Sequence, residues 1–256
     1  MVGKSKKKLI ASLAHKKYRD KNSLFVAEGS KLVNDLLDAG LKSELIYSTK
    51  ENAITEKHKK LITQIIDNNE LKQLSFLTHP RDVIALFRQP DFSFTFGEHR
   101  HNLTLCLDGI QDPGNMGTIL RLAAWFNIPY VVCSPDTVDA FNPKVIQASM
   151  GAIAHVKVHY TQLNDFCQRS NKELNLEIFG TFMQGQNIYS LALPDKGIIV
   201  LGNEGNGIRA ETARTITTRL SIPKFERPNG SSSIESLNVG IAAAIICSEF
   251  HRSTFC

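Results

Sequence analysis

The sequence predicts an α/β protein in which a mostly parallel sheet with helices on both faces follows a smaller α/β region. From Leu103 onward, short apolar segments alternate with helical stretches, which is typical of covered parallel sheets. Before that point the chain is richer in Lys and Asn, and its patterns are mixed. With 256 residues, 42% of them hydrophobic, the chain can bury a sizeable core in one or two domains, and a disordered or collagen-like protein is excluded.

The first region is predicted to contain one amphipathic helix and two short strands. Apolar residues at 32, 33, 36 and 37 form one stripe along Glu28–Ala39, and Gly40 is a typical helix stop. Glu44–Tyr47 and Val83–Phe87 have strand patterns. The stretch from 88 to 102 contains Pro90 and Gly97, which predicts an N-terminal domain at 1–90, a linker at 91–102 and a second domain at 103–256.

In the second region the predicted strands are Leu103–Leu107, Pro129–Cys133, His155–Val158, Leu176–Gly180, Gly197–Leu201 and Arg219–Ile222. Helices are expected over Thr118–Phe126 and Ser236–Phe250. Binding sites in parallel sheets lie in the loops that follow the carboxyl ends of the strands. We therefore expect the functional residues in those loops.

Composition also indicates a location. The five cysteines form no CxxC pair and have no zinc-ligand spacing, which favours a reducing cytoplasm over a disulfide framework. The basic N-terminus is followed by no apolar stretch, and Val239–Cys247 is far shorter than the roughly 20 residues that span a bilayer. We expect a soluble, cytoplasmic protein without membrane contact, and no metal, because no His/Asp/Glu cluster has ligand spacing.

Positive charge is concentrated at the N-terminus. The net charge is +5, and eight basic residues between positions 4 and 21 are opposed only by Asp20. Such a cluster favours salt-dependent RNA or DNA binding, and Tyr18 and Phe25 are near enough to stack on bases. A solubilising, frayed terminus is the simpler alternative.

The first loop after a strand runs from Asp108 to Arg121 and is rich in Gly, Pro and Asn. Asn115 is expected to precede and cap the helix. A helix N-terminus with a nearby Arg121 is suited to an RNA phosphate, although a capped helix with a surface Arg explains the same residues. Asp108 and Asp112 are explained by turn chemistry more simply than by magnesium.

Two further loops follow predicted strands. In Leu201-Gly-Asn-Glu-Gly205, with Gly207, glycines come directly after an apolar strand and let a ligand approach the backbone. The spacing fits neither nucleotide fingerprint, and a flexible turn is the alternative. The third loop continues from Pro223 to Ser236 and Asn238, which open an Ala-rich helix. Ser236 is the expected cap, with Asn238 in the first turn.

Together and in this order, these three motifs resemble the SpoU (TrmH) family of SPOUT methyltransferases over about residues 103–250. Lys16-Lys-Tyr-Arg19 and Phe25-Val-Ala-Glu-Gly29 resemble the substrate-binding domain that precedes the catalytic domain in many members. The resemblance implies methyl transfer from S-adenosylmethionine to a ribose 2′-hydroxyl of rRNA or tRNA. It also implies a deep C-terminal trefoil knot, which general folding rules would not predict, and a homodimer.

The resemblance further implies roles for single residues. Arg121 matches the family's catalytic Arg, and the other residues expected in the catalytic network are Asn115, Glu204, Ser236 and Asn238. The expected cofactor pocket contains Thr181, Phe182, Leu201, Gly202, Gly205, Ile222, Pro223 and Leu237. The expected RNA-binding residues are Lys16, Lys17 and Arg19.

Other functions stay open at this point. One alternative is a base methyltransferase with the same SPOUT fold, in which the methyl group goes to a base atom. Another is a non-catalytic RNA-binding or ribosome-assembly protein with this fold. The N-terminal domain type favours rRNA over tRNA, but RNA is recognised through surfaces too distributed to identify the nucleotide. Small residues on the closing helix fit dimer packing, although they also fit packing within one subunit.

Overall fold

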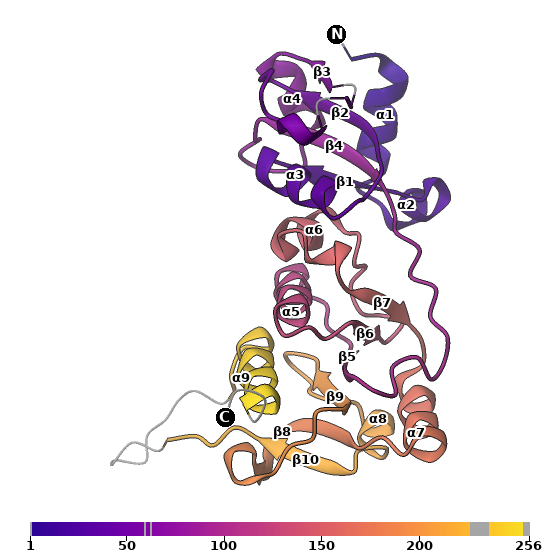
Figure 1. Cartoon of the computed structure of the whole chain (residues 1–256), viewed down its shortest axis with the longest axis vertical. Coiled ribbons are helices and arrows are strands. Elements are labelled where there is room, and N and C mark those ends of the chain that lie inside the picture. The colour runs from indigo at the N-terminus through magenta and orange to yellow at the C-terminus, as the bar shows by residue number, and fades with distance from the viewer. Residues whose placement is uncertain (1, 59, 62, 226–235, 253–256) are drawn as a thin grey trace. The chain divides into compact units, whose positions relative to one another are not determined.

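The structure is a computed structural model that describes the chain except residues 1, 59, 62, 226–235 and 253–256 (Figure 1). Contacts divide the chain into unit 1, made of Met1–Asp91 and Asp139–His155, and unit 2, made of Phe92–Val138 and Val156–Cys256. Residues 139–155, which the sequence pattern assigned to the second domain, thus group with unit 1. The ring of Phe141 packs 5.3 Å from that of Phe25, which explains the grouping.

Unit 1 contains a four-stranded mixed sheet in the order β1-β4-β2-β3. The strands are β1 (Leu24–Glu28), β2 (Ser43–Ser48), β3 (Thr63–Ile65) and β4 (Val83–Arg88). β4 pairs antiparallel with both β1 and β2, whereas β2 and β3 are parallel. All five residues of β1 are buried, as expected for a strand covered on both faces.

The helical elements of unit 1 are α1 (Lys4–Ser12), α2 (Lys16–Asn22), α3 (Ser30–Asp38), η1 (Glu56–His58), α4 (Asn68–Leu74), α6 (Pro143–Ser149) and η2 (Ala152–Ala154). Ile10 of α1 and Leu71 of α4 share one core cluster with Val26 and Leu86 of the sheet. These two helices therefore cover one face. The amphipathic helix and the two strands predicted in this region are present within about two residues of their expected bounds.

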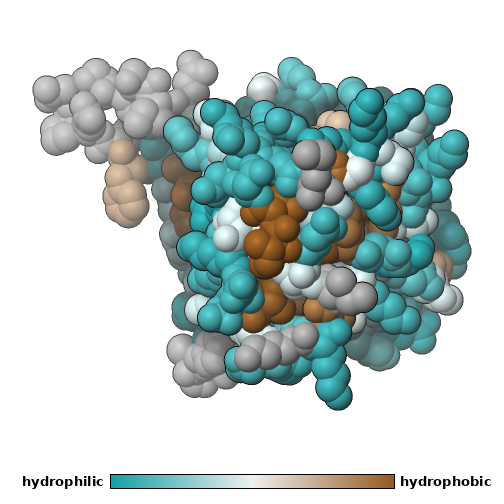
Figure 2. All heavy atoms as spheres, turned by 90° about the horizontal axis from the view of Figure 1, so that it is seen from above, coloured by the Kyte–Doolittle hydropathy of each residue, from teal (hydrophilic) through white to brown (hydrophobic). Residues whose placement is uncertain are grey.

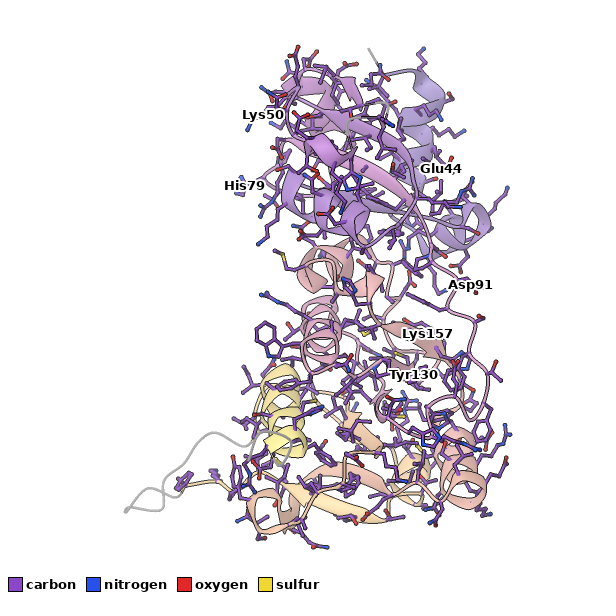
Figure 3. All side chains as sticks on the ribbon, in the orientation of Figure 1. Glu44, Lys50, His79, Asp91, Tyr130 and Lys157 are labelled. Atoms are coloured by element: carbon purple, nitrogen blue, oxygen red, sulfur yellow. The ribbon has the colours of Figure 1, made fainter. Side chains whose placement is uncertain are left out.

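Unit 2 contains a six-stranded sheet in the order β10-β8-β9-β5-β6-β7, and all its pairings are parallel. Its strands are β5 (Leu103–Asp108), β6 (Tyr130–Cys133), β7 (Lys157–Tyr160), β8 (Ile178–Asn187), β9 (Gly197–Gly202) and β10 (Thr218–Ser221). Lys157 and Tyr130 show the β6–β7 pairing in Figure 3, with the Lys157 amine 5.7 Å from the Tyr130 ring centroid.

Helices cover both faces of this sheet. They are α5 (Pro113–Trp125), α7 (Leu163–Leu174), α8 (Ala210–Ala213) and α9 (Val239–Arg252), with η3 (Ile188–Ser190) as a short turn. Phe166 and Cys167 of α7 pack in one core cluster with Cys106 and Val200 of the sheet. α9 contacts α5 and β9. The predicted α/β class with a parallel sheet is confirmed; the trefoil knot remains a prediction.

Both helices next to the expected site begin elsewhere than predicted. α5 starts at Pro113, five residues earlier than expected, because Asp112 caps it and Pro suits the first helical position. α9 starts at Val239, where Asn238 Oδ1 accepts hydrogen bonds from Gly240 N at 2.9 Å and Ile241 N at 3.3 Å. Asn238 is therefore the cap that the sequence analysis assigned to Ser236.

In the part of the chain that the structure describes, no helix has the length and hydropathy needed to cross a membrane. The face shown in Figure 2 is largely hydrophilic, with a few apolar side chains gathered near its middle.

Candidate active site

The first predicted loop joins β5 to α5 and fixes Asn115. Asp112 Oδ1 accepts a hydrogen bond from Asn115 N at 2.8 Å, so Asp112, not Asn115, caps the helix. The expectation that Asn115 precedes the helix is therefore wrong. Its place in the first turn leaves its side-chain amide available for contacts with the other loops.

A chain of hydrogen bonds joins all three predicted loops through their side chains. Asn238 Nδ2 donates to Asn115 Oδ1 at 2.9 Å, and Asn115 Nδ2 donates to Glu204 Oε1 at 2.8 Å. The direction of this chain is chemically fixed. Because backbone N–H groups of α9 donate to Asn238 Oδ1, the Asn238 amide must present its NH2 group to Asn115, which in turn presents its own NH2 group to Glu204.

The second loop is held by Asn203, which sequence analysis did not single out. Asn203 Oδ1 accepts from Gly205 N and Asn206 N, both at 3.0 Å, and Nδ2 donates to Gly109 O at 2.7 Å. The backbones of Asn203 and Gly207 exchange two hydrogen bonds at 2.9 and 3.0 Å. Asn203 therefore shapes the loop that carries Glu204 and ties it to the first loop.

Gly202 is required by close packing. A Cβ atom at this position would lie 2.3 Å from the carbonyl carbon of Gly207, closer than real Cβ contacts allow. The loop thus folds back directly against the end of β9. The sequence analysis expected a ligand at the backbone of these glycines; at Gly202 the neighbouring backbone belongs to the same loop, and the ligand contact stays a prediction.

An ion-paired cluster fastens the other end of the second loop. Arg209 N donates to Oδ2 of the buried Asp108 at 2.9 Å, and the Arg209 guanidinium pairs with Asp136. Burial raises the pKa of Asp136, but hydrogen bonds from Arg209 and Ser134 outweigh burial and hold this pKa below its usual range. Gly109 has a positive φ of 72°, and a Cβ there would lie 2.8 Å from the Arg209 guanidinium. No sequence motif links the three residues of this cluster, Asp108, Asp136 and Arg209, so sequence analysis could not have found it.

Arg121 lies on α5 but outside the hydrogen-bonded chain. Its side chain is exposed, and within the described residues it has no hydrogen bond or ion pair. The structure therefore pairs Glu204 with Asn115 and not with Arg121. Ser236 is also exposed, two residues before the α9 cap.

The predicted cofactor residues come from three segments of unit 2. Leu201 is buried, Gly202 is half-buried and Gly205 is exposed. Thr181 and Phe182 lie in β8, where the pairing with β10 skips from Gly180 to Gln186, and Arg219 lies 4.4 Å from the Phe182 ring centroid. The remaining predicted residues are the half-buried Ile222 and Pro223 and the exposed Leu237, which flank the part of the third loop (226–235) outside the described residues.

The predicted RNA-binding residues have different environments in unit 1. Lys16 and Lys17 are exposed on α2, and Lys16 pairs with Asp20 at 2.9 Å. Arg19 is only 2% exposed: its guanidinium bonds Asp139 at 2.8 and 2.5 Å and two backbone carbonyls at 2.8 Å. Arg19 therefore stabilises unit 1 through its ion pair and hydrogen bonds, and its guanidinium is not exposed to RNA.

Comparison with known proteins gives the class. Residues 102–248 match the SpoU rRNA Methylase family, and residues 4–85 match the MRM3-like substrate binding domain. The chain therefore belongs to the SpoU rRNA Methylase family. The predicted family and enzyme class are confirmed.

Individual relatives share the whole architecture. The chain is 26% identical over 233 residues to the Bacillus subtilis 23S rRNA (guanosine(2553)-2'-O)-methyltransferase RlmP. The matched residues cover 90% of each chain. It is 37% identical to a solved structure, that of a putative RNA methyltransferase of the TrmH family from Porphyromonas gingivalis. The two folds superpose with a TM-score of 0.85, and 99% of each chain is covered. The AdoMet-bound rRNA methyltransferase of Sinorhizobium meliloti has the same fold at 24% identity, with a TM-score of 0.82 and coverage of 100% of this chain and 97% of that one.

Proposed function

We propose that this chain transfers the methyl group of S-adenosylmethionine to a ribose 2′-hydroxyl of rRNA. The observation that carries the proposal is the hydrogen-bonded chain from Asn238 through Asn115 to Glu204, which unites three loops beside the carboxyl ends of β5 and β9. The names of the relatives supply the target atom: RlmP is a 23S rRNA guanosine 2′-O-methyltransferase.

The residues present fit S-adenosylmethionine. The space beside Gly205 and Gly207 is open. A Cβ atom at Gly205 would have its nearest heavy atom at 3.6 Å, and one at Gly207 would have none within 4 Å. Such a loop offers exposed backbone groups to a ligand. In our proposal Ile222, Pro223 and Leu237 supply the apolar contacts to the cofactor. The Sinorhizobium relative is an AdoMet-bound rRNA methyltransferase, which supports this assignment.

S-adenosylmethionine supplies an activated methyl electrophile, so no covalent intermediate on the protein is required. The difficult partner is the ribose hydroxyl, which is barely ionised at neutral pH. The protein must align this oxygen and stabilise the charge that develops on it. In our proposal Arg121 holds the neighbouring phosphate and the hydroxyl together, and the proton leaves through that phosphate or a water.

Glu204 and the third loop act as positioning groups in this proposal. The Asn115 amide occupies Glu204 Oε1, and Glu204 Oε2 has no hydrogen bond within the described residues. That oxygen is available to orient the ribose or Arg121. Ser236, exposed at the entrance to α9, completes the polar set.

The wider setting is part of the same proposal. RNA reaches unit 1 through exposed lysines that include Lys16 and Lys17, and the protein acts in the cytoplasm as a homodimer. Arg121 is exposed and has no hydrogen bond or ion pair within the described residues, which supports a homodimer in which the partner completes the site. The four cysteines that the structure describes are free and buried, which fits a reducing compartment.

The test is transfer of labelled methyl from S-adenosylmethionine to rRNA that lacks the modification, followed by digestion to nucleosides. Wild type should label a 2′-O-methyl nucleoside. Arg121→Ala should lower kcat by about 10²–10³ while leaving cofactor affinity unchanged, as expected for loss of a transition-state donor. Arg100→Ala, which removes an exposed arginine of the linker, is the matched control and should transfer normally.

The outcomes separate the alternatives. Label on a base would overturn the ribose assignment and keep a base methyltransferase. Absence of both transfer and cofactor binding would favour a non-catalytic assembly protein. Normal turnover in Arg121→Ala would remove Arg121 from the mechanism.

A further inference from the structure

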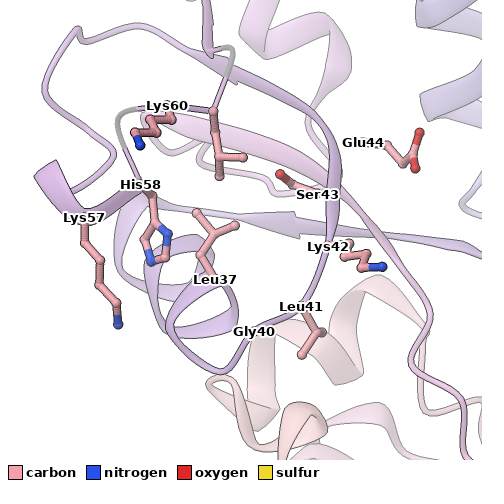
Figure 4. A pocket seen from close by; sticks show the side chains of 10 residues that line it. Leu37, Gly40, Leu41, Lys42, Ser43, Glu44, Lys57, His58 and Lys60 are labelled. Atoms are coloured by element: carbon pink, nitrogen blue, oxygen red, sulfur yellow. The ribbon is translucent and has the colours of Figure 1, made fainter.

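An open hollow lies in unit 1, far in sequence from the predicted catalytic loops (Figure 4). Its walls are the C-terminal end of α3, the start of β2 and the segment around η1. Its volume is about 490 Å³, within the range of pockets that hold small ligands.

The strand pairing explains why the hollow exists. Within the described residues, β3 pairs with β2 from Ile46 to Ser48, beginning with Ile46 opposite Thr63. The first residues of β2, from Ser43 on, pair with β4 on one side, and no described residue of β3 pairs with them on the other. Gly40, with a φ of 85°, turns the chain sharply from α3 into β2 and leaves this corner uncovered.

The rim of the hollow is basic. Lys42, Lys57 and Lys60 line it. Within the described residues, Lys42 and Lys60 have no ion-pair partner. Two unpaired amines at one opening favour an anionic ligand.

The nearby carboxylates are already engaged. Asp38 accepts from Lys57 Nζ at 2.7 Å and lies 3.0 Å from His58 Nε2. Glu44 pairs with Arg88 Nε at 2.6 Å. The positive charge of the rim is therefore only partly neutralised by the protein itself.

Leucine side chains form the apolar part of the lining. Leu37 is buried, and Leu41 and Leu61 are half-buried. An apolar surface with cations at its edge matches a nucleotide, whose flat base needs an apolar contact and whose phosphate needs a cation.

We propose that this hollow binds one nucleotide of a single-stranded segment of the RNA substrate, with the base against Leu41 and Leu61 and the flanking phosphates at Lys42 and Lys60. The identity of that RNA rests on the proposed function, whereas the binding itself does not. The hollow is a contact separate from the lysines of α2. It would help to select the RNA by holding an unpaired nucleotide.

The test is binding of a fluorescent 12-nucleotide single-stranded RNA to the full chain, measured by anisotropy over a salt series. Lys42→Ala with Lys60→Ala should weaken binding about tenfold and lower the salt slope by about 1.4, the value for two lost phosphate contacts on a single strand. Lys72→Ala with Lys172→Ala removes two exposed helical lysines elsewhere and is the charge-matched control. Leu41→Asn should weaken binding with no change in salt slope, because it removes apolar contact and leaves the charges.

Crosslinking locates the contact directly. The same RNA carrying 4-thiouridine should crosslink to peptides within residues 37–61, and circular dichroism should show that each variant is folded. The proposal would be overturned if both double-lysine variants lost RNA affinity equally, or if crosslinks formed only outside residues 37–61. It would also be overturned if the wild type did not bind RNA, a result that would favour an acidic protein partner. If wild type crosslinks at 37–61 but transfers no methyl group, the proposed function fails and the nucleotide site stands.

Discussion

Asn203 offers the sharpest test of how the second loop is held. Its side chain makes three hydrogen bonds, one to Gly109 O and two from backbone amides of its own loop. Its orientation is unambiguous, since a carbonyl only accepts and an amide N–H only donates. Asn203→Ala removes all three bonds. Asn203→Asp keeps both acceptor contacts but places an oxygen against the Gly109 carbonyl, 2.7 Å away in the wild type.

The magnitude follows from this inventory. A typical intramolecular hydrogen bond contributes about 0.5–1.5 kcal/mol, and the half-buried position of Asn203 favours the lower part of that range. Asn203→Ala should therefore cost about 1.5–3 kcal/mol, three bonds at the lower values. For a unit of this size, that corresponds to a fall in Tm of about 3–12 °C. Asn203→Asp should lose at least the Gly109 bond, about 1 kcal/mol.

The assay is thermal unfolding followed by circular dichroism, with S-adenosylmethionine affinity measured on the same samples by calorimetry. Both variants should melt earlier and bind the cofactor more weakly, because the loop that carries Glu204 is no longer tied to Gly109. Asn206→Ala is the matched control: its exposed side chain has no hydrogen bond within the described residues. If Asn203→Ala melted like Asn206→Ala, the proposed role of Asn203 would be refuted.

Three further predictions concern Gly202, Asn238 and the buried His99. Gly202→Ala places a Cβ 2.3 Å from the Gly207 carbonyl carbon and should cost about 1–3 kcal/mol by overpacking, whereas Gly205→Ala, with its nearest neighbour at 3.6 Å, should melt like wild type. Asn238→Asp should keep the α9 cap and the melting temperature but lower methyl transfer, because a carboxylate cannot donate to Asn115; equal destabilisation by Asn238→Asp and Asn238→Ala would contradict this. Burial lowers the pKa of His99 from 6.5 to about 4, so the unfolded state binds more protons between these values and stability should fall as the pH drops from 6.5 to 4. Urea titrations of His99→Gln should show a smaller fall over that window, and an unchanged pH profile would show that His99 does not contribute.

The sequence predicted the central strands of unit 2 well because they are buried on both faces. β5 and β9 are runs of apolar residues, and their observed bounds extend the predicted ones by a single residue. Helix starts were less predictable. Asp112-Pro113 is a strong start signal, but the glycine and asparagine that follow are equally typical of a turn, so α5 was expected to begin too late.

Long-range partners were beyond the sequence pattern. Arg19 belongs to a basic segment and has the composition of an RNA contact, yet its partner Asp139 lies 120 residues away and takes it into the interior. The same reason explains why contacts group residues 139–155 with unit 1, although their position in the chain assigns them to the second predicted domain. The contacts among Asp108, Arg209 and Asp136 likewise form only once the strands are paired, so the sequence alone does not reveal them.

The candidate site shows why each motif was weak alone and specific in combination. The side-chain amide of Asn115 has no partner within its own loop, and its two hydrogen bonds go to Glu204 and Asn238, from the other two. The orientation of Glu204 thus depends on the first amides of α9, relayed through two asparagine side chains. A substitution of Asn115 should therefore disturb the polar groups of the other two loops, because both of its side-chain hydrogen bonds cross to them.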